Sequence, residues 1–384
     1  MKGSFLLEKE IAAGLRESNK YTCPQVLSKG PIFGLGYRSP WFLGNIVQAE
    51  VTKKYNLNSM FAQQSAREIQ RTGRSFQDVI DSASISAFLT GIKAPWGADA
   101  DHLKTDENIK DAVKAGFTHF TFDLIDQVNE SWQAVIDRIT AMHKLTKNLM
   151  GKKDFTIELS LDETEELVKI SELASLMDEL KKRKIRVDEV APRFPGYFEK
   201  AIDYYYKSVN GKKIKDTKAF EEYLVEIVKL SNKYGFRTSV HSGSDKFTIY
   251  PIVARIAKKN FHLKTAGTFY LEELKVVAKY NYDLFKDVYA LSLKQFKKDC
   301  ATYELSANLK NLPDISKVKN GQMVNLLTTF TGNDDLRQVL HVTYGSVLQN
   351  KELTENIFMV LKNNEEDYSK IMSEHIVKHV EKCL

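Results

Sequence analysis

The chain alternates short β-type runs with longer segments of helical periodicity, and this alternation limits the folds open to it. The short runs lie at residues 31–36, 59–65, 94–102, 118–124, 154–161, 187–194, 236–243 and 261–267. Mainly apolar strands that alternate with helices are typical of a parallel sheet covered by helices. Because there are about eight such runs, we predict an α/β fold of the (β/α)8 TIM-type barrel class. An open doubly wound sheet is the alternative architecture.

Two helical segments between these runs carry clear stop signals. "DENIKDAVKAGF" ends at Gly116, and "FEEYLVEIVKLSNKYGF" ends at Gly235. Glycine is favoured just after a helix because it adopts a left-handed backbone easily. After residue 268 the pattern is mainly helical, apart from an interruption expected at 335–348. We therefore predict one domain over 1–384, in which residues from about 269 to 384 pack on the barrel as a helical extension.

Ionisable side chains gather in or just after the predicted strands. In a (β/α)8 barrel the carboxyl ends of the strands form the rim that carries the active site. The residues expected there are Asp99, Asp101, His102, Lys104, Glu158, Arg193, His241, Ser242, Asp245, Lys246, His262 and Lys264. We therefore expect several strands to deliver acids, amines and imidazoles to one site.

Each of these residues also has a purely structural interpretation. A single histidine at a strand end is more often hydrogen-bonded within the fold than bound to a metal. Asp99 has the position of a helix N-cap, and Asp106 that of a helix start. Glu158 is harder to explain in this way, because burying an unpaired charge among β residues is costly. We expect Glu158 either to face the top of the barrel or to have a cationic partner.

Three histidines together match the ligands of a divalent metal site. His102, His241 and His262 all lie in or after predicted strands. Neutral imidazoles bind borderline ions such as Zn²⁺, Ni²⁺ or Mn²⁺ and leave positions open for substrate oxygens. His341 is expected at the rim and His119 in the core. His143, His375 and His379 lie on helical stretches and are expected in solvent.

Composition excludes several classes of function. The net charge is +6, but lysine and glutamate are mixed along the chain, so we expect no nucleic-acid partner. The cysteines, Cys23, Cys300 and Cys383, are far apart, as expected in a reducing cytoplasm. No signal segment and no run of about eighteen apolar residues is present, so we expect neither secretion nor a membrane span. Homo-oligomer formation is left open.

Several long motifs resemble those of the tagaturonate epimerase family, also described as tagaturonate/fructuronate epimerase. They are "FAQQSAREIQRTGR", "WGADADHLKT", "LDETEE", "APRFPGYFEKAIDY", "HSGSDKFTIYP" and "HLKTAGTFYLEEL", spread over most of the chain. The resemblance implies a metal-dependent barrel enzyme that inverts C4 of a ketohexuronate, D-tagaturonate to D-fructuronate, in bacterial hexuronate catabolism. It further implies acid/base roles for Asp101 and Glu158, and metal binding by His102, His241 and His262.

This substrate class sets chemical requirements. In a 2-ketohexuronate the carbonyl is C2 and the carboxylate C6, so enolisation cannot invert C4. Retro-aldol cleavage of C3–C4 can invert it, with a metal on the C2 oxygen, Asp101 as base and Glu158 as acid, or with these two roles exchanged when the reaction runs in the other direction. Direct deprotonation and metal-assisted hydride movement are the other routes.

The carboxylate of the substrate requires fixed cations, and the sugar hydroxyls require polar groups. Lys246, Lys264 and Arg193 are the cations expected to bind the carboxylate. Gln63 and Gln64 are expected to contact hydroxyls, with Asp245 and His341 also at the substrate. The small residues 242–244 are interpreted as leaving room for close approach of the substrate to this turn.

Three other functions remain open on the residues alone. A class II-type sugar aldolase or an aldose–ketose isomerase would use the same metal and the same enediolate chemistry. A Schiff-base aldolase would use Lys246 or Lys264 as nucleophile. A non-catalytic sugar-binding protein would need no acid/base group. Product analysis, borohydride trapping and an Asp101→Asn variant distinguish these functions from the epimerase.

Overall fold

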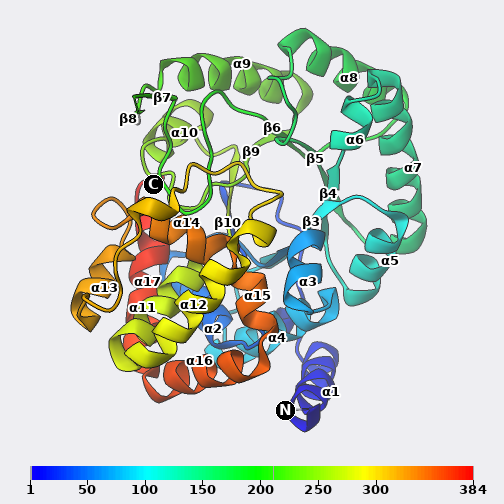
Figure 1. Ribbon diagram of the computed structural model, residues 1–384. Helices are drawn as coiled ribbons and strands as arrows, with labels where there is room; N and C mark the ends of the chain where they lie inside the picture. Colours follow the sequence, from blue (N-terminus) through cyan, green and yellow to red (C-terminus); the bar gives the residue numbers. More distant parts are fainter. Residues whose placement is uncertain (1, 211, 384) are drawn as a thin grey trace.

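The computed structural model describes residues 2–210 and 212–383 and shows a closed parallel barrel surrounded by helices (Figure 1). Its strands are β1 (Ile32–Leu35), β2 (Asn58–Ser65), β3 (Trp96–Leu103), β4 (His119–Asp123), β5 (Thr156–Leu161), β6 (Glu189–Pro192), β9 (Arg237–Val240) and β10 (Phe261–Thr265). They pair in the order β1-β10-β9-β6-β5-β4-β3-β2, and β1 closes on β2. Each barrel strand overlaps one predicted run, so the predicted barrel is confirmed and the open sheet is excluded.

Helices connect the strands and cover the outside of the barrel. They are α2 (Leu43–Tyr55), α3 (Ala66–Thr72), α4 (Phe76–Thr90), α5 (Asp106–Ala115), α6 (Ile125–Val128), α7 (Trp132–Met150), α8 (Ile170–Lys182), α9 (Lys218–Tyr234) and α10 (Tyr250–Ala257). Helix α1 (Lys2–Ser18) precedes them, and a small hairpin, β7 (Lys207–Val209) and β8 (Lys212–Ile214), lies before α9. The predicted stop signals are confirmed, since Gly116 and Gly235 cap α5 and α9 with φ of 99° and 80°.

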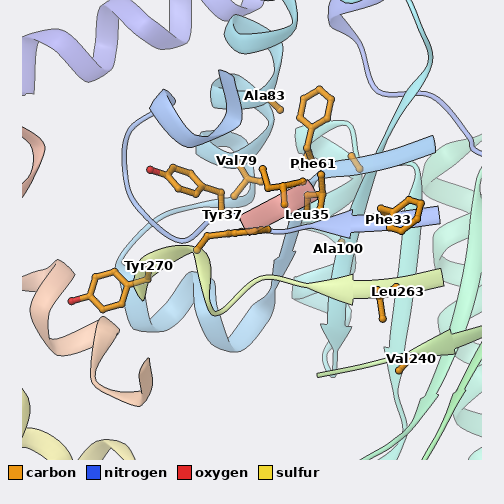
Figure 2. Packing of buried hydrophobic residues seen from close by; sticks show 14 of the residues in the cluster. Phe33, Leu35, Tyr37, Phe61, Val79, Ala83, Ala100, Val240, Leu263 and Tyr270 are labelled. Atoms are coloured by element: carbon orange, nitrogen blue, oxygen red, sulfur yellow. The ribbon is translucent and has the colours of Figure 1, made fainter. Parts of the chain in front are cut away.

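A two-residue alternation separates the two faces of the barrel strands. On β4 and β10, Phe120 and Leu263 belong to the apolar core, whereas His119 and Lys264 contact other polar groups inside the barrel. Figure 2 shows apolar side chains, Phe33 and Leu263 among them, packed around the strands. Successive strand residues point to opposite faces. The apolar face therefore binds the helices, and the interior of the barrel is left to polar side chains.

The chain after β10 is helical, as expected. It forms α11 (Phe269–Tyr280), α12 (Tyr282–Asp299), α13 (Asn320–Leu326), α14 (Asp334–Val342), α15 (Tyr344–Gln349), α16 (Lys351–Asn363) and α17 (Glu365–Glu381). Helix α17 contacts α2 and α11, and α15 contacts α3, so these helices lie along one side of the barrel (Figure 1). The predicted interruption at 335–348 is wrong, because α14 and α15 occupy it. Residues 336–342 of α14 are all buried, so its polar side chains Arg337 and Gln338 lie inside the protein.

A buried ion pair ties this helical part to the loop after β9. Asp245 and Arg337 are both fully buried, and the Arg337 guanidinium binds an Asp245 carboxylate oxygen. His379 on α17 accepts a hydrogen bond from the Asp245 backbone N–H at 3.1 Å, and His375 lies 3.6 Å from the carboxylate. His375 and His379 are therefore buried, and the expectation that they face solvent is wrong. The reason is their packing against this loop.

Replacing Asp245 with asparagine should leave the Arg337 charge buried without a counter-charge. We expect the free energy of unfolding to fall by about 3–5 kcal/mol. Asp111→Asn, at an exposed position of α5, is the control and should change it by less than about 0.5 kcal/mol. Urea unfolding of both variants measures the difference. Equal stability of the two variants would contradict the role assigned to the ion pair.

Candidate active site

A cavity opens at the carboxyl ends of the strands and brings together residues from several barrel loops. The predicted residues that line it are Gln63, Asp101, His102, His241, Lys246, Lys264 and His341. Glu158 is fully buried beneath it and touches His241 and Lys264. Arg38, Arg67, Asp162, Lys200 and Tyr303, which the sequence analysis did not select, also line the cavity.

Two backbone irregularities place the imidazoles at this rim. The β3–β4 register shifts between Ala100 and Leu103, and His102 there has a φ of 50°. His241 directly follows β9, and the next residue, Ser242, has a φ of 52°. Left-handed backbone is uncommon for residues with a side chain and is concentrated at functional sites. The local conformation therefore turns both imidazoles into the cavity.

Asp101, His102 and His241 form a group that could hold a metal ion. One ligand atom from each residue lies within 4.8 Å of the others. Behind the imidazoles, His102 Nδ1 lies 3.3 Å from an Asp123 oxygen, and His241 Nδ1 lies 3.2 Å from an Asp162 oxygen. Metal-binding histidines usually donate their second ring N–H to such a carboxylate. The donor set and its supporting carboxylates therefore fit a divalent ion.

The carboxylates also determine the charge of the two imidazoles. Burial lowers the pKa of His102, but Asp101 and the contact with Asp123 outweigh burial and raise it to about 9. Burial likewise lowers the pKa of His241, but Asp162 and Glu158 outweigh burial and raise this pKa to about 10. Both imidazoles are therefore cationic at neutral pH when no ion is bound.

Lys264 lies at the centre of the carboxylates inside the barrel. Its Nζ is 2.8 Å from Asp99 Oδ2, 2.9 Å from Asp101 Oδ1 and 2.9 Å from Glu158 Oε2. It also donates to Thr121 Oγ1 at 2.8 Å. Burial would lower the pKa of this amine, but the three carboxylates hold it well above its usual range. Lys264 is therefore an ammonium group, and Asp99 is its partner rather than a helix cap.

His262 belongs to a different group, deeper in the barrel. It lies with His119, Glu158 and Glu189, and its Nδ1 is 2.7 Å from Glu189 Oε2. In the β9–β10 pairing His262 aligns with Ser239, two residues before His241, or roughly 7 Å lower along the strand direction. Of the three histidines predicted to share one metal ion, His102 and His241 therefore lie together and His262 lies in the deeper group. His119 lies in the interior, as expected, but within an ionic group.

The remaining predicted cations are engaged elsewhere. Lys246 Nζ donates to the backbone oxygens of Glu199, Ile202 and Ser244 at 2.6–3.1 Å. Arg193 lines a neighbouring pocket and donates to the Thr164 oxygen at 2.5 Å. The Lys246 ammonium is thus bound by three main-chain oxygens, and Arg193 lies in the neighbouring pocket instead of this cavity.

Three other predicted residues differ in their access to the cavity. Gln64 is fully buried and donates to Glu68 Oε2 at 2.7 Å, whereas Gln63 lines the cavity and its Oε1 has no hydrogen-bond partner among the described residues. His341 lines the cavity 3.3 Å from Arg38 Nη1. Asp245, described above, binds Arg337 instead of facing the cavity. Gln63 and His341 are thus the polar residues of the predicted set that remain open to a substrate.

Gly243 is small for a reason that the sequence analysis did not identify. A Cβ at this position would lie 2.6 Å from Leu263 Cδ1 and 2.9 Å from the Lys264 carbonyl oxygen. The neighbouring strand β10, rather than a substrate, therefore requires glycine. Ser242 and Ser244 line the cavity, and the approach of a substrate to this turn stays a prediction.

The functional residues that were missed share one property. Asp123, Asp162 and Glu189 follow or lie within predicted strands, as do the residues that were selected. The alternation of β4, with His119, Thr121 and Asp123 on one face, was the available signal for an ionic barrel interior.

Comparison with known proteins shows the family to which the chain belongs. The family model described as "UxaE: tagaturonate epimerase" matches residues 5–144 and 131–383. A tagaturonate/fructuronate epimerase from Thermotoga maritima is 34% identical, over 97% of this chain and 82% of its own length. The native crystal structure of fructuronate-tagaturonate epimerase from Cohnella laeviribosi has a TM-score of 0.84, at 28% identity over 98% of this chain and 86% of that chain. Its complex with one glycerol has a TM-score of 0.85 over the same shares, at the same 28% identity. The chain therefore belongs to the tagaturonate epimerase family, a family of carbohydrate epimerases within the isomerases.

Proposed function

We propose that the chain is a metal-dependent epimerase that inverts C4 of a 2-ketohexuronate, converting D-tagaturonate to D-fructuronate. The observation that carries this proposal is the meeting of a metal-type donor group and the Lys264–carboxylate cluster at one cavity, in a chain of this family. His341, on the C-terminal helix α14, lines the same cavity. We therefore treat residues 1–384 as one catalytic unit.

We assign the metal to Asp101, His102 and His241. Two imidazoles and one carboxylate match the donors of Zn²⁺, Ni²⁺ or Mn²⁺ sites that keep positions open. A bound ion there would act as a Lewis acid towards the C2 carbonyl oxygen. Asp101 was first expected to act only as an acid/base group. Its closeness to both imidazoles supports a role as the third donor, in place of His262.

We assign proton transfer to Lys264 and to the carboxylate of Glu158 that it contacts. Lys264 lines the cavity, whereas Glu158 is buried beneath it, so the ammonium is the group that reaches the substrate. We propose that the Lys264 ammonium passes a proton to Glu158 and takes up the proton of the C4 hydroxyl. The C3–C4 bond then breaks, its electron pair stays with C3, and C4 becomes an aldehyde. The aldehyde turns, the bond forms again on its other face, and the proton returns to the C4 oxygen.

The rival functions find less support in this arrangement. A Schiff-base lysine must be an uncharged amine, but three carboxylates keep Lys264 charged. Burial lowers the pKa of Lys246 to about 8, yet its Nζ is bound to three backbone oxygens. A class II-type aldolase would use the same groups and differs in releasing two shorter products, which product analysis detects.

The cellular context is part of the proposal. No helix in the described parts of the chain is both long enough and apolar enough to cross a membrane. Cys23, Cys300 and Cys383 are free thiols, which suits a reducing cytoplasm. We propose that the enzyme acts there on a small sugar acid, in hexuronate catabolism.

Metal loading should release protons. With pKa values of about 9 and 10, His102 and His241 both carry a proton at pH 7, and a metal ion must displace it. We expect about two protons per ion when chelator-treated protein is titrated with Zn²⁺, Ni²⁺ or Mn²⁺ at pH 7, and tighter binding as pH rises towards 10. The released protons are measured with an indicator dye in weak buffer. Full turnover by exhaustively demetallated protein would contradict the proposal.

Asp101→Asn and Glu158→Gln should have different effects. We expect Asp101→Asn to lower both the bound metal and the activity. Glu158→Gln should keep its metal but lose about 10²–10⁴-fold in kcat, because Lys264 loses a proton acceptor. Glu165→Gln, at an exposed position after β5, is the control and should match the wild type. Elemental analysis and steady-state kinetics measure the two effects. Metal loss in Glu158→Gln would overturn the division of roles.

The fate of hydrogen at C4 tests the retro-aldol route. When D-tagaturonate is incubated with the metal-loaded enzyme in D2O, we expect D-fructuronate that has no deuterium at C4. Cleavage and re-formation of C3–C4 leave the C4–H bond intact, whereas direct deprotonation at C4 replaces this hydrogen with deuterium from the solvent. NMR of the product measures both epimerisation and labelling. Deuterium at C4 would exclude the retro-aldol route, and a mixture of shorter fragments as sole products would favour the aldolase.

A further inference from the structure

Five lysine and arginine side chains line the cavity, and four of them are already engaged. These are Arg38, Arg67, Lys200, Lys246 and Lys264. Arg38 pairs with Glu68 at 2.6 Å and Arg67 with Glu163 at 2.9 Å. Lys246 binds backbone oxygens and Lys264 binds carboxylates, as described above. Among residues 2–210 and 212–383, Lys200 has no carboxylate oxygen within 4.0 Å of its ammonium, so its charge is available to an anionic ligand.

Lys200 lies next to the proposed metal group. Its Nζ donates to Ser242 Oγ at 2.6 Å, and Ser242 is the residue after His241. The ring centroid of Tyr303 is 5.8 Å from the same ammonium. One hydroxyl and one aromatic face leave further N–H donors of Lys200 free. A substrate that reaches His241 is therefore within reach of this ammonium.

The turn that carries Lys200 is held firmly, although it is a loop. Glu199 is buried and accepts hydrogen bonds from Tyr205 at 2.5 Å, Ser306 at 2.6 Å and Gln338 at 2.7 Å. Lys246 bridges the Glu199 and Ile202 carbonyl oxygens at 2.8 and 2.6 Å. A group held in this way loses little entropy when it binds a ligand. The neighbouring Glu199 carboxylate is occupied by these donors and does not neutralise Lys200.

Arg38 and His341 also line the cavity. The Arg38 guanidinium stacks on the Tyr344 ring at 4.0 Å and lies 3.3 Å from His341. Burial lowers the pKa of His341 well below its usual range, and the cations Arg38 and Lys200 lower it further. His341 is thus neutral and does not repel a cation. The carboxylates that line the cavity have cationic partners of their own: Asp162 lies 3.2 Å from His241, and Glu68 and Glu163 pair with the two arginines.

We propose that Lys200 binds the carboxylate of the sugar acid and so selects acids over neutral ketohexoses. The inference rests on the proposed function for the identity of the sugar. The C6 carboxylate belongs to the aldehyde fragment that must turn between cleavage and bond formation. A fixed ammonium at the carboxylate retains that fragment in the cavity between cleavage and bond formation.

Binding by the metal-loaded, full-length protein tests this assignment without requiring turnover. Isothermal titration calorimetry compares D-tagaturonate with the neutral ketohexose D-tagatose, for wild type, Lys200→Met and Lys200→Arg. We expect Lys200→Met to weaken acid binding about 10- to 100-fold, the usual effect of losing a charged hydrogen bond, and to change D-tagatose binding less than about threefold. Lys200→Arg should retain most of the affinity for the acid.

Lys153→Met is the matched control, because it removes the same charge from an exposed position before β5, at the opposite end of the barrel. It should change neither affinity. Unchanged acid binding by Lys200→Met would overturn the inference, and so would an equal loss for both sugars, which indicates a general structural effect. If Lys200→Met weakens acid binding as expected, but the wild type does not epimerise the acid, the proposed function alone is refuted. A wild type that does not bind the acid would refute both.

Discussion

The ion pairs of Lys264 with Asp99, Asp101 and Glu158 are the interaction on which the rest of the barrel interior depends. TIM-type barrels usually fill this space with branched apolar side chains. Here the interior contains charged groups that water cannot solvate, so each needs a partner within the protein. Lys264 compensates three carboxylates, and Glu158 extends the network to His241 at the rim and His119 below. The stability of the barrel and the chemistry of the site therefore use the same side chains.

The helices after β10 complete the site instead of only covering the barrel. Arg337 binds the loop after β9 through Asp245, and Gln338 holds Glu199 in the loop after β6. Arg337 and Gln338 both lie on α14, which also brings His341 to the cavity. One short helix thus fixes two loops of the rim. This explains how a lysine on a loop, Lys200, is held at a defined position beside the proposed metal group.

Some parts of the site were predictable from sequence, because they follow from local order. The ends of parallel strands meet at one rim, so Asp101, His102, His241 and Lys264 could be expected to lie together once eight strands were identified. The level of each residue along its strand was harder to predict. His262 and His241 lie on neighbouring strands but differ by two positions in register, and this separates them into two groups. Register depends on strand pairing, which a single sequence does not contain.

By itself, the sequence determined the strand–helix alternation, the helix stops at Gly116 and Gly235, and the presence of polar residues on one face of buried strands. These features depend on neighbours a few residues apart. Only the tertiary structure decided which charges are compensated. Lys246 and Lys200 look alike in the sequence. In the described parts of the chain, however, Lys246 is bound to three carbonyl oxygens, whereas Lys200 lines the cavity and has no carboxylate oxygen within 4.0 Å of its ammonium. That difference arises from contacts between segments distant in the chain.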